Sequence, residues 1–149
     1  MKTTLIFALV CFLLICSCKK EEQTPTDPRD NYTGIWSGKE TIYYPVGTHS
    51  TYDVNYEIQK NANVSNQIDF LESTSYIEYT AKVNDNSTHT LDPCNFADNR
   101  TPFAINTMQT GSGTISGDKL TESGVQLQLV DGKYYNCTFT RNLTLIVKY

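Results

Sequence analysis

Few side chains of this 149-residue chain could do chemistry: five cysteines, two histidines and scattered carboxylates. His49 and His89 both fall in turn-rich or edge segments, which predicts surface residues rather than a metal ligand or a general base. Asp53 and Glu57 could form a carboxylate pair, but they share the polar parity of an alternating segment, so both are expected to face solvent. No nucleophile motif, HExxH sequence, phosphate-binding loop or EF-hand loop is present. The sequence therefore predicts neither an enzyme nor a metal or cofactor site.

One thiol stands where an apolar run meets a charged segment. Leu5–Ile15 is apolar over about eleven residues behind Lys2, as in a signal peptide, and is shorter than the roughly 20 residues of a membrane-spanning helix. The run leads into Ile15-Cys16-Ser17-Cys18, which resembles the bacterial lipobox, with Cys16 replacing the family's usual small residue. The resemblance implies that residues 1–17 are a lipoprotein signal peptide and that the sulfur of Cys18 carries the lipid. The alternative is an ordinary cleaved signal peptide followed by a chance cysteine.

The charged segment behind Cys18 bears on localisation. Lys19-Lys20-Glu21-Glu22 resembles the surface-export signal of Bacteroidetes-type lipoproteins, and the resemblance implies an outer-membrane lipoprotein displayed at the cell surface. The alternative is a solvated charged tether without a signal. Gln23–Asp30 contains two prolines and no residue that calls for burial. Residues 18–30 are therefore expected to be the lipidated cysteine and a disordered tether that spans about 20 Å as a coil.

Two further cysteines, Cys94 and Cys137, lie beyond the signal peptide and the lipidation site. An even pair in an exported domain predicts one disulfide, which would stabilise the fold by roughly 3–4 kcal/mol in the chain-entropy model. The alternative is two buried free thiols. The two cysteines are far apart and have no nearby histidine or CxxC motif, so they make a poor zinc site.

Composition and charge limit the expected partners. Hydrophobic residues make up 39% of the chain and charged residues 19%, and residues 31–149 suffice for one domain of ordinary size. The net charge is −4, and no basic cluster exists beyond Lys19-Lys20. Nucleic acid is therefore not an expected partner, whereas the lipid would tie the protein to a membrane.

From residue 31 onwards, short alternating runs lie between clusters of Asn, Gly, Asp and Ser, which is typical of an all-β domain. A period near 3.6 residues persists nowhere. We expect eight strands, at about 34–44, 51–60, 67–72, 76–83, 87–91, 103–115, 119–130 and 134–149. Residues 92–102 contain two prolines and are expected to be irregular or to hold a single helical turn.

Glycines and parity predict two irregularities late in the sheet. Gly111 and Gly113 indicate a bulge or a sharp bend in the sixth strand. In the seventh strand the inward parity slips ahead of Val125, Leu127 and Leu129, which predicts a bulge at residues 122–124.

The first and last strands carry a tryptophan and an arginine on their inward faces. Trp36 follows Gly34, and Arg141 is the one charged member of an otherwise apolar set. This pairing resembles the lipocalins and related calycins, and the segment 111–117 with the late Cys137 resembles small lipocalin-like lipoproteins of Bacteroidetes-type bacteria. The resemblance implies an eight-stranded antiparallel up-and-down barrel over residues 31–149, with Arg141 over the ring of Trp36 at one barrel end. The alternative fold is a β-sandwich.

Two functions stay open for such a domain. The preferred hypothesis is a lipid-anchored barrel that binds a small apolar ligand or a partner. The alternative is an envelope interaction module without a cavity that contacts protein or glycan. Large inward residues would fill the barrel, and the chain has many: Phe70, Phe103, Phe139, Tyr43, Tyr44, Tyr52 and Tyr56. The tyrosines could instead line a pocket or a sugar-binding face.

Overall fold

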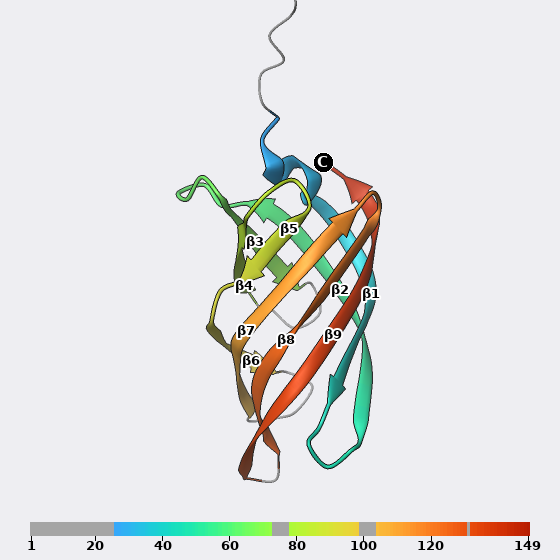
Figure 1. The fold of residues 1–149 in the computed structure, drawn as a ribbon, viewed down its shortest axis with the longest axis vertical. Helices are drawn as coiled ribbons and strands as arrows, with labels where there is room; N and C mark the ends of the chain where they lie inside the picture. Colours follow the sequence, from blue (N-terminus) through green and yellow to red (C-terminus); the bar gives the residue numbers. More distant parts are fainter. Residues whose placement is uncertain (1–25, 73–77, 99–103, 131) are drawn as a thin grey trace, which may run out of the picture.

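The computed structural model describes residues 26–72, 78–98, 104–130 and 132–149. They form a closed, eight-stranded, antiparallel up-and-down β-barrel, which confirms the expected fold class and excludes the sandwich (Figure 1). A short 3₁₀ helix, η1 (Pro28–Asn31), precedes the strands. The strands are β1 (Gly34–Tyr43), β2 (His49–Lys60), β3 (Gln67–Glu72), β4 (Glu78–Val83), β5 (Thr88–Leu91), β6 (Cys94–Asp98), β7 (Ala104–Ser116), β8 (Lys119–Val130) and β9 (Lys133–Lys148).

The wall closes on itself where β5 pairs with β7. β6 continues along the same edge of β7, since Leu91 pairs with Gly111 and Cys94 pairs with Met108 in one unbroken register. β5 and β6 are therefore two parts of one strand, interrupted at Asp92-Pro93. A proline has no N–H for the ladder, which explains why the strand breaks there. The expected irregular segment 92–102 is thus wrong at its start, because pairing with β7 outweighs the local turn signal.

The described strand ends agree with the expected ranges within about two residues. β3 and β8 match, and residues 76–77 of the expected fourth strand lie outside the described residues. The late bulge lies in β7, where the register to β8 shifts between Met108 and Thr110. The bulge expected at residues 122–124 is wrong, because β8 keeps an unbroken register with β9 from end to end.

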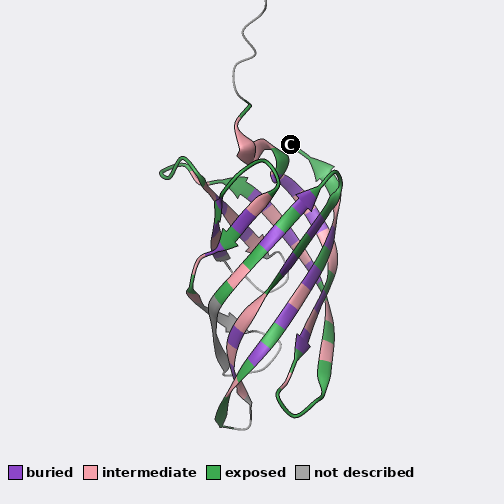
Figure 2. Cartoon of the chain, in the orientation of Figure 1, coloured by how far each residue is buried: buried purple, intermediate pink, exposed green. Residues whose placement is uncertain are grey.

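That unbroken register decides which residues of β8 line the interior. Leu120, Glu122, Gln126 and Gln128 are buried, whereas Val125, Leu127 and Leu129 are only half-buried. The strand therefore turns amides inward and apolar side chains outward over its second half. Figure 2 shows the alternation of buried and exposed residues along the strands.

The two ends of the barrel differ. The cap end carries η1, the C-terminus and the turns at residues 61–66 and 84–87, and the far end carries the β1–β2 hairpin and the start of β9 (Figure 1). The rings and aliphatic side chains that fill the barrel are Tyr32, Trp36, Ile42, Ile58, Ile68, Phe70, Tyr79, Leu91, Leu120, Phe139 and Leu143, all exposed by less than 2%.

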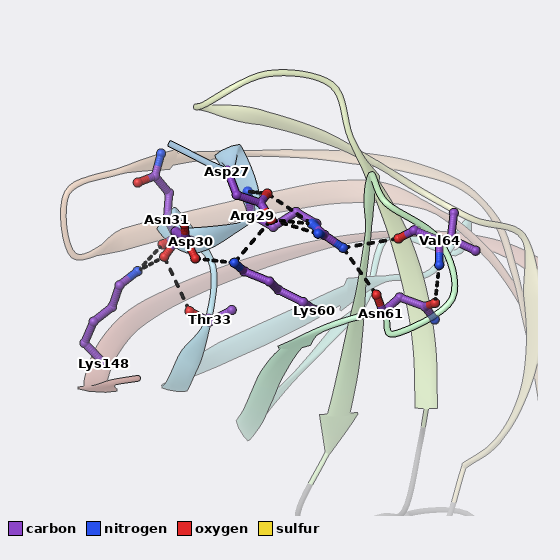
Figure 3. A network of polar contacts seen from close by, with 9 residues as sticks. All are labelled: Asp27, Arg29, Asp30, Asn31, Thr33, Lys60, Asn61, Val64 and Lys148. Carbon is purple, nitrogen blue, oxygen red and sulfur yellow. Dashed lines mark hydrogen bonds and ion pairs between the residues drawn. The ribbon is translucent and has the colours of Figure 1, made fainter. Parts of the chain in front are cut away.

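The chain before β1 is docked rather than free over its last residues. Asp27 caps η1 by accepting from the backbone N–H of Arg29, and the Arg29 guanidinium donates to the carbonyls of Asn61 and Val64 (Figure 3). Lys60 pairs with Asp27 and Asp30. The prediction of a disordered tether up to residue 30 is therefore wrong for residues 27–30, because these charges find partners on the β2–β3 loop.

The last strand also holds this cap. Lys148 on β9 donates to the carbonyl oxygens of Asp30 and Asn31 (Figure 3). Tyr32, which follows them in the chain, is fully buried. η1 and Tyr32 thus close the cap end of the barrel.

Candidate functional site

A row of charged side chains crosses the barrel interior at mid-height. Glu122 on β8 pairs in register with Arg141 on β9, and Arg141 pairs in register with Glu40 on β1. All three are exposed by 3% or less. Neighbouring strands therefore present acid, base and acid side by side, which is the arrangement that a buried guanidinium requires.

Arg141 makes several charge-assisted contacts. Its Nε and NH2 lie 2.8 Å from Oε1 of Glu40, and its NH1 lies 3.1 Å from Oε2 of Glu122. NH1 also donates to the hydroxyl of Tyr79 at 3.2 Å, and that hydroxyl donates to Glu122 Oε2 at 3.2 Å. Every nitrogen of the guanidinium thus has an acceptor, so Arg141 is held in place rather than offered to a ligand.

His89 on β5 completes the charge row, which we define as Glu40, Glu122, Arg141 and His89. Its Nε2 lies 2.8 Å from Oε1 of Glu122. The strand between them is β7, and its residue in this row is Gly113. A Cβ at Gly113 would lie 2.3 Å from the His89 ring, so only glycine leaves room for the imidazole to cross β7. The prediction that His89 is a surface residue is wrong, since it is fully buried.

Aromatic rings surround the guanidinium. Arg141 Cζ lies 4.5 Å from the ring centre of Phe139, 5.0 Å from that of Tyr79 and 5.5 Å from that of Tyr56. The expected burial of Arg141 is confirmed, but its partner is not Trp36. Trp36 pairs in register with Leu145, four residues along β9 from Arg141, or about 13 Å away. Its indole N–H donates instead to the carbonyl of Tyr32, so Trp36 anchors the cap.

Electrostatics in the charge row favour the ionised form of Glu122. Burial raises the pKa of this carboxyl, but the hydrogen bond from His89 and the charge of Arg141 lower the pKa more, so its net pKa lies below the usual value. Burial raises the pKa of Tyr79 far above that of a free tyrosine, which keeps its hydroxyl protonated as a donor. An ionised Glu122 and a protonated Tyr79 are the partners that the buried guanidinium of Arg141 requires.

Below the charge row lies a different lining, which we call the far-end interior: Tyr44, Tyr52, Gln126, Gln128, Tyr135 and Cys137. Gln126 is exposed by only 1%, yet neither its amide nitrogen nor its amide oxygen has a hydrogen-bond partner in the part of the chain that the structure describes. Gln128 is also buried. The tyrosines of this lining, Tyr44, Tyr52 and Tyr135, are only half-buried.

The two cysteines of the domain also belong to this end. Cys94 and Cys137 are free thiols, so the predicted disulfide is not formed. Register gives the reason: Cys94 pairs with Met108, Met108 with Gln126 and Gln126 with Cys137. Three strand spacings amount to about 14 Å along the wall, whereas a disulfide needs Cα atoms within about 7 Å. Burial raises the pKa of both thiols, which stay protonated at neutral pH.

The outer wall carries a shallow hollow of about 400 Å³ over β7, β8 and β9. Its lining side chains are small and polar: Ser112, Thr114, Thr121, Ser123, Thr140 and Asn142. Thr114 and Thr121 hydrogen-bond to each other at 2.9 Å across the strands. The hollow offers hydroxyl groups to solvent but holds no buried side chain without a partner.

Other predicted features lie apart from the interior. Asp53 faces solvent and pairs with Lys39, as the alternation predicted, and the outer positions of β2 do not gather into a carboxylate site. Across the described ranges, no group of three or more His, Cys, Asp or Glu side chains is placed to hold a metal ion. None of the described helices is long and apolar enough to cross a membrane. Cys18 lies outside the described residues.

The sequence contained a signal for part of this site. Glu40 shares the parity of Trp36 and Ile42 in the first strand, so alternation alone would have marked it as an inward charge opposite Arg141. Glu122, Gln126 and Gln128 were missed because the apolar residues between them suggested a slip in parity. His89 has no local signal, since only the absent side chain of Gly113 allows its placement.

Comparison with known proteins yields solved structures of modest similarity and no family. No family model and no curated protein sequence matches the chain. Among solved structures, the crystal structure of Rv2717c from M. tuberculosis is similar with a TM-score of 0.43 and 11% identity, over 78% of this chain and 93% of that chain. At this identity and TM-score the likeness carries no information on ligand or function.

Proposed function

We propose that this protein is a lipid-anchored barrel of the outer membrane, displayed at the cell surface, that binds a small molecule through its far-end interior. The observation that carries the binding proposal is Gln126, a buried amide without partners beneath half-buried tyrosines. Buried polar groups in proteins nearly always have a partner, so an exception marks a place where a bound molecule or water belongs.

The rest of the interior argues for this end over the other. Around the charge row and the cap, Arg141 is saturated with acceptors, and the unpartnered Tyr32 hydroxyl and His89 Nδ1 are enclosed by fully buried rings that fill the space. In the far-end interior, the half-buried side chains of Tyr44, Tyr52 and Tyr135 leave room for a ligand to reach the polar lining. The sequence favoured an apolar ligand, but two inward glutamines favour one with hydrogen-bonding groups.

The test of binding uses Cys94, a half-buried thiol at the same end. The lipidated protein is purified in nanodiscs, and native mass spectrometry before and after denaturation searches for a released small molecule. In parallel, the alkylation rate of Cys94 is measured against a library of small molecules, and we expect saturable protection by some of them. Absence of any released molecule, together with an unchanged alkylation rate for every compound, would refute the binding function.

The anchor is supported by the run Leu5–Ile15 ending in Ile15-Cys16-Ser17-Cys18 and by the charged pair of lysines behind it. We expect Cys18→Ala to abolish incorporation of labelled lipid, while Cys16→Ala, which alters a residue of the signal peptide, leaves labelling intact. Protease treatment of whole cells then tests display. Lipid labelling of the Cys18→Ala protein would contradict the lipid anchor. Resistance of the wild-type protein to protease on whole cells would contradict surface display.

A second candidate function rests on the outer hollow. Its exposed hydroxyl and amide side chains could contact a protein or a glycan, as an envelope interaction module would. Ser123→Arg at its centre would then abolish partner capture while leaving protection of Cys94 unchanged.

A further inference from the structure

The described side chains of the far-end interior are neutral, and this narrows the class of molecule that they can hold. Its described side chains are tyrosines, glutamines and a cysteine, and burial raises the pKa of both Tyr44 and Cys137. Arg141 of the charge row is buried in the same barrel, but its nitrogens already have acceptors. A charged ligand would therefore be buried without a counter-charge, which is strongly unfavourable. The ligand that fits is uncharged.

The unpartnered group specifies more than polarity. A glutamine amide presents an acceptor oxygen beside a donor N–H, and at Gln126 both lack partners while the residue is exposed by only 1%. A ketone would satisfy only the N–H and leave the oxygen buried and unpaired, and a single hydroxyl would meet both groups only through bent hydrogen bonds. A second amide edge, with a donor beside an acceptor in the opposite order, satisfies both at once.

Neighbouring side chains support a partner seated at Gln126. Tyr44 contacts Ser50 and Tyr52 by hydrogen bonds and lies near Cys137, which is the residue paired with Gln126 across β8 and β9. Tyr44 directly follows β1, Ser50 and Tyr52 lie on β2, and Cys137 lies on β9. They offer hydroxyl groups and flat ring faces to whatever meets the amide.

We infer that the far-end interior binds a neutral molecule with an amide or imide edge, held by a paired hydrogen bond to Gln126. This inference rests on the proposed binding function and names the ligand class for that same site. Because Gln126 reads a donor and an acceptor together, the site should reject a molecule of equal size that lacks them.

The experiment compares matched probes on the full lipidated chain in nanodiscs, with the alkylation rate of Cys94 as readout. The amide probes are benzamide and 2-pyridone, and the apolar probe of similar size is ethylbenzene. We expect the amide probes to protect Cys94 in the wild-type protein at concentrations about tenfold lower than ethylbenzene. The key variant is Gln126→Leu, which keeps the volume of the side chain but removes both polar atoms.

In Gln126→Leu, we expect the amide probes to lose about tenfold or more in apparent affinity and ethylbenzene to bind at least as well as before. The matched control is Gln59→Leu, the same chemical change at an exposed position of β2, which should alter neither. Equal protection by benzamide in the wild-type and Gln126→Leu proteins overturns the inference while leaving the binding function intact.

Two remaining outcomes also decide the matter. If ethylbenzene protects wild-type Cys94 better than either amide, the interior takes apolar ligands and the inference is wrong. A third result would be that no probe protects Cys94 and that Gln126→Leu unfolds at a higher temperature. Water alone would then meet the amide, and both the ligand class and the proposal that this end binds a ligand would be wrong.

Discussion

The two halves of the barrel interior share strands but differ in how deeply their side chains are buried and in which polar groups have partners. Near the cap, rings exposed by less than 2% pack around a charge row in which Arg141 touches two carboxylates. Near the far end, half-buried tyrosines stand over Gln126, whose amide has no partner among the described residues. β8 and β9 run through both, so the difference arises from side chains and not from the backbone. Both halves hold buried polar atoms without a partner among the described residues, namely the Tyr32 hydroxyl and His89 Nδ1 near the cap and the Gln126 amide near the far end. The first two lie among fully buried rings, whereas the amide shares its lining with half-buried tyrosines.

The largest test of this comparison is Arg141→Ala. Removing the guanidinium leaves Glu40 and Glu122 buried without their cation, so we expect a loss of about 3–5 kcal/mol in the free energy of unfolding. Denaturant melts measure it. Thr140→Ala, the neighbouring residue on the outer face, should cost less than about 0.5 kcal/mol. Similar losses for the two variants would mean that the charge row does not hold the barrel.

A smaller effect is expected from Gly113→Ala. The new methyl group would meet the His89 ring, so His89 must move away from Glu122, at about 1–3 kcal/mol. The loss should shrink in the double variant Gly113→Ala with His89→Ala, because the clash with the ring is then gone and only the close approach to the Thr121 carbonyl oxygen remains. Strictly additive losses in thermal melts would show that the glycine serves another purpose.

The smallest effect is a dependence on pH. The pKa of Glu122 is lower in the folded protein than in the unfolded chain, so its contribution is full above the unfolded value of about 4.3 and is lost as pH falls through the folded value. The slope per proton is at most about 1.4 kcal/mol per pH unit. Melts in acid should show a shallower slope for Glu122→Gln than for the wild-type protein. Equal slopes would assign the acid sensitivity to surface carboxylates such as Asp27, whose pKa is also lowered, chiefly by Arg29.

The fold was predictable because its signals are local. Alternation with turn residues located the strands, and the parity of Arg141 correctly placed a charge inside. The partners of that charge could not be read in the same way, since register between strands decides that Glu40 and Glu122 flank Arg141 while Trp36 lies four positions away. The bulge was expected in β8 but lies in β7, and this error in register assigned Gln126 to the outer face.

The errors in the cap and the cysteines have the same physical origin. Asp27 and Arg29 look like solvated charges until the β2–β3 loop supplies carbonyls for them. Cys94 and Cys137 look like a pair until the order of β6, β7, β8 and β9 separates them. Both depend on which segments meet in space, and neither depends on the residues nearby in sequence.

The pairing of β1 with β9 has a kinetic consequence. Gly34 pairs with Lys148, and the cap in front of β1 is held by that same lysine. The first strand to emerge during synthesis or export must therefore wait for the last one before the wall can close. Such long-range closure is slow, on the order of milliseconds to seconds for all-β domains. Until then one edge of β1 stays open to mispairing, so chaperones would have their greatest effect on this strand.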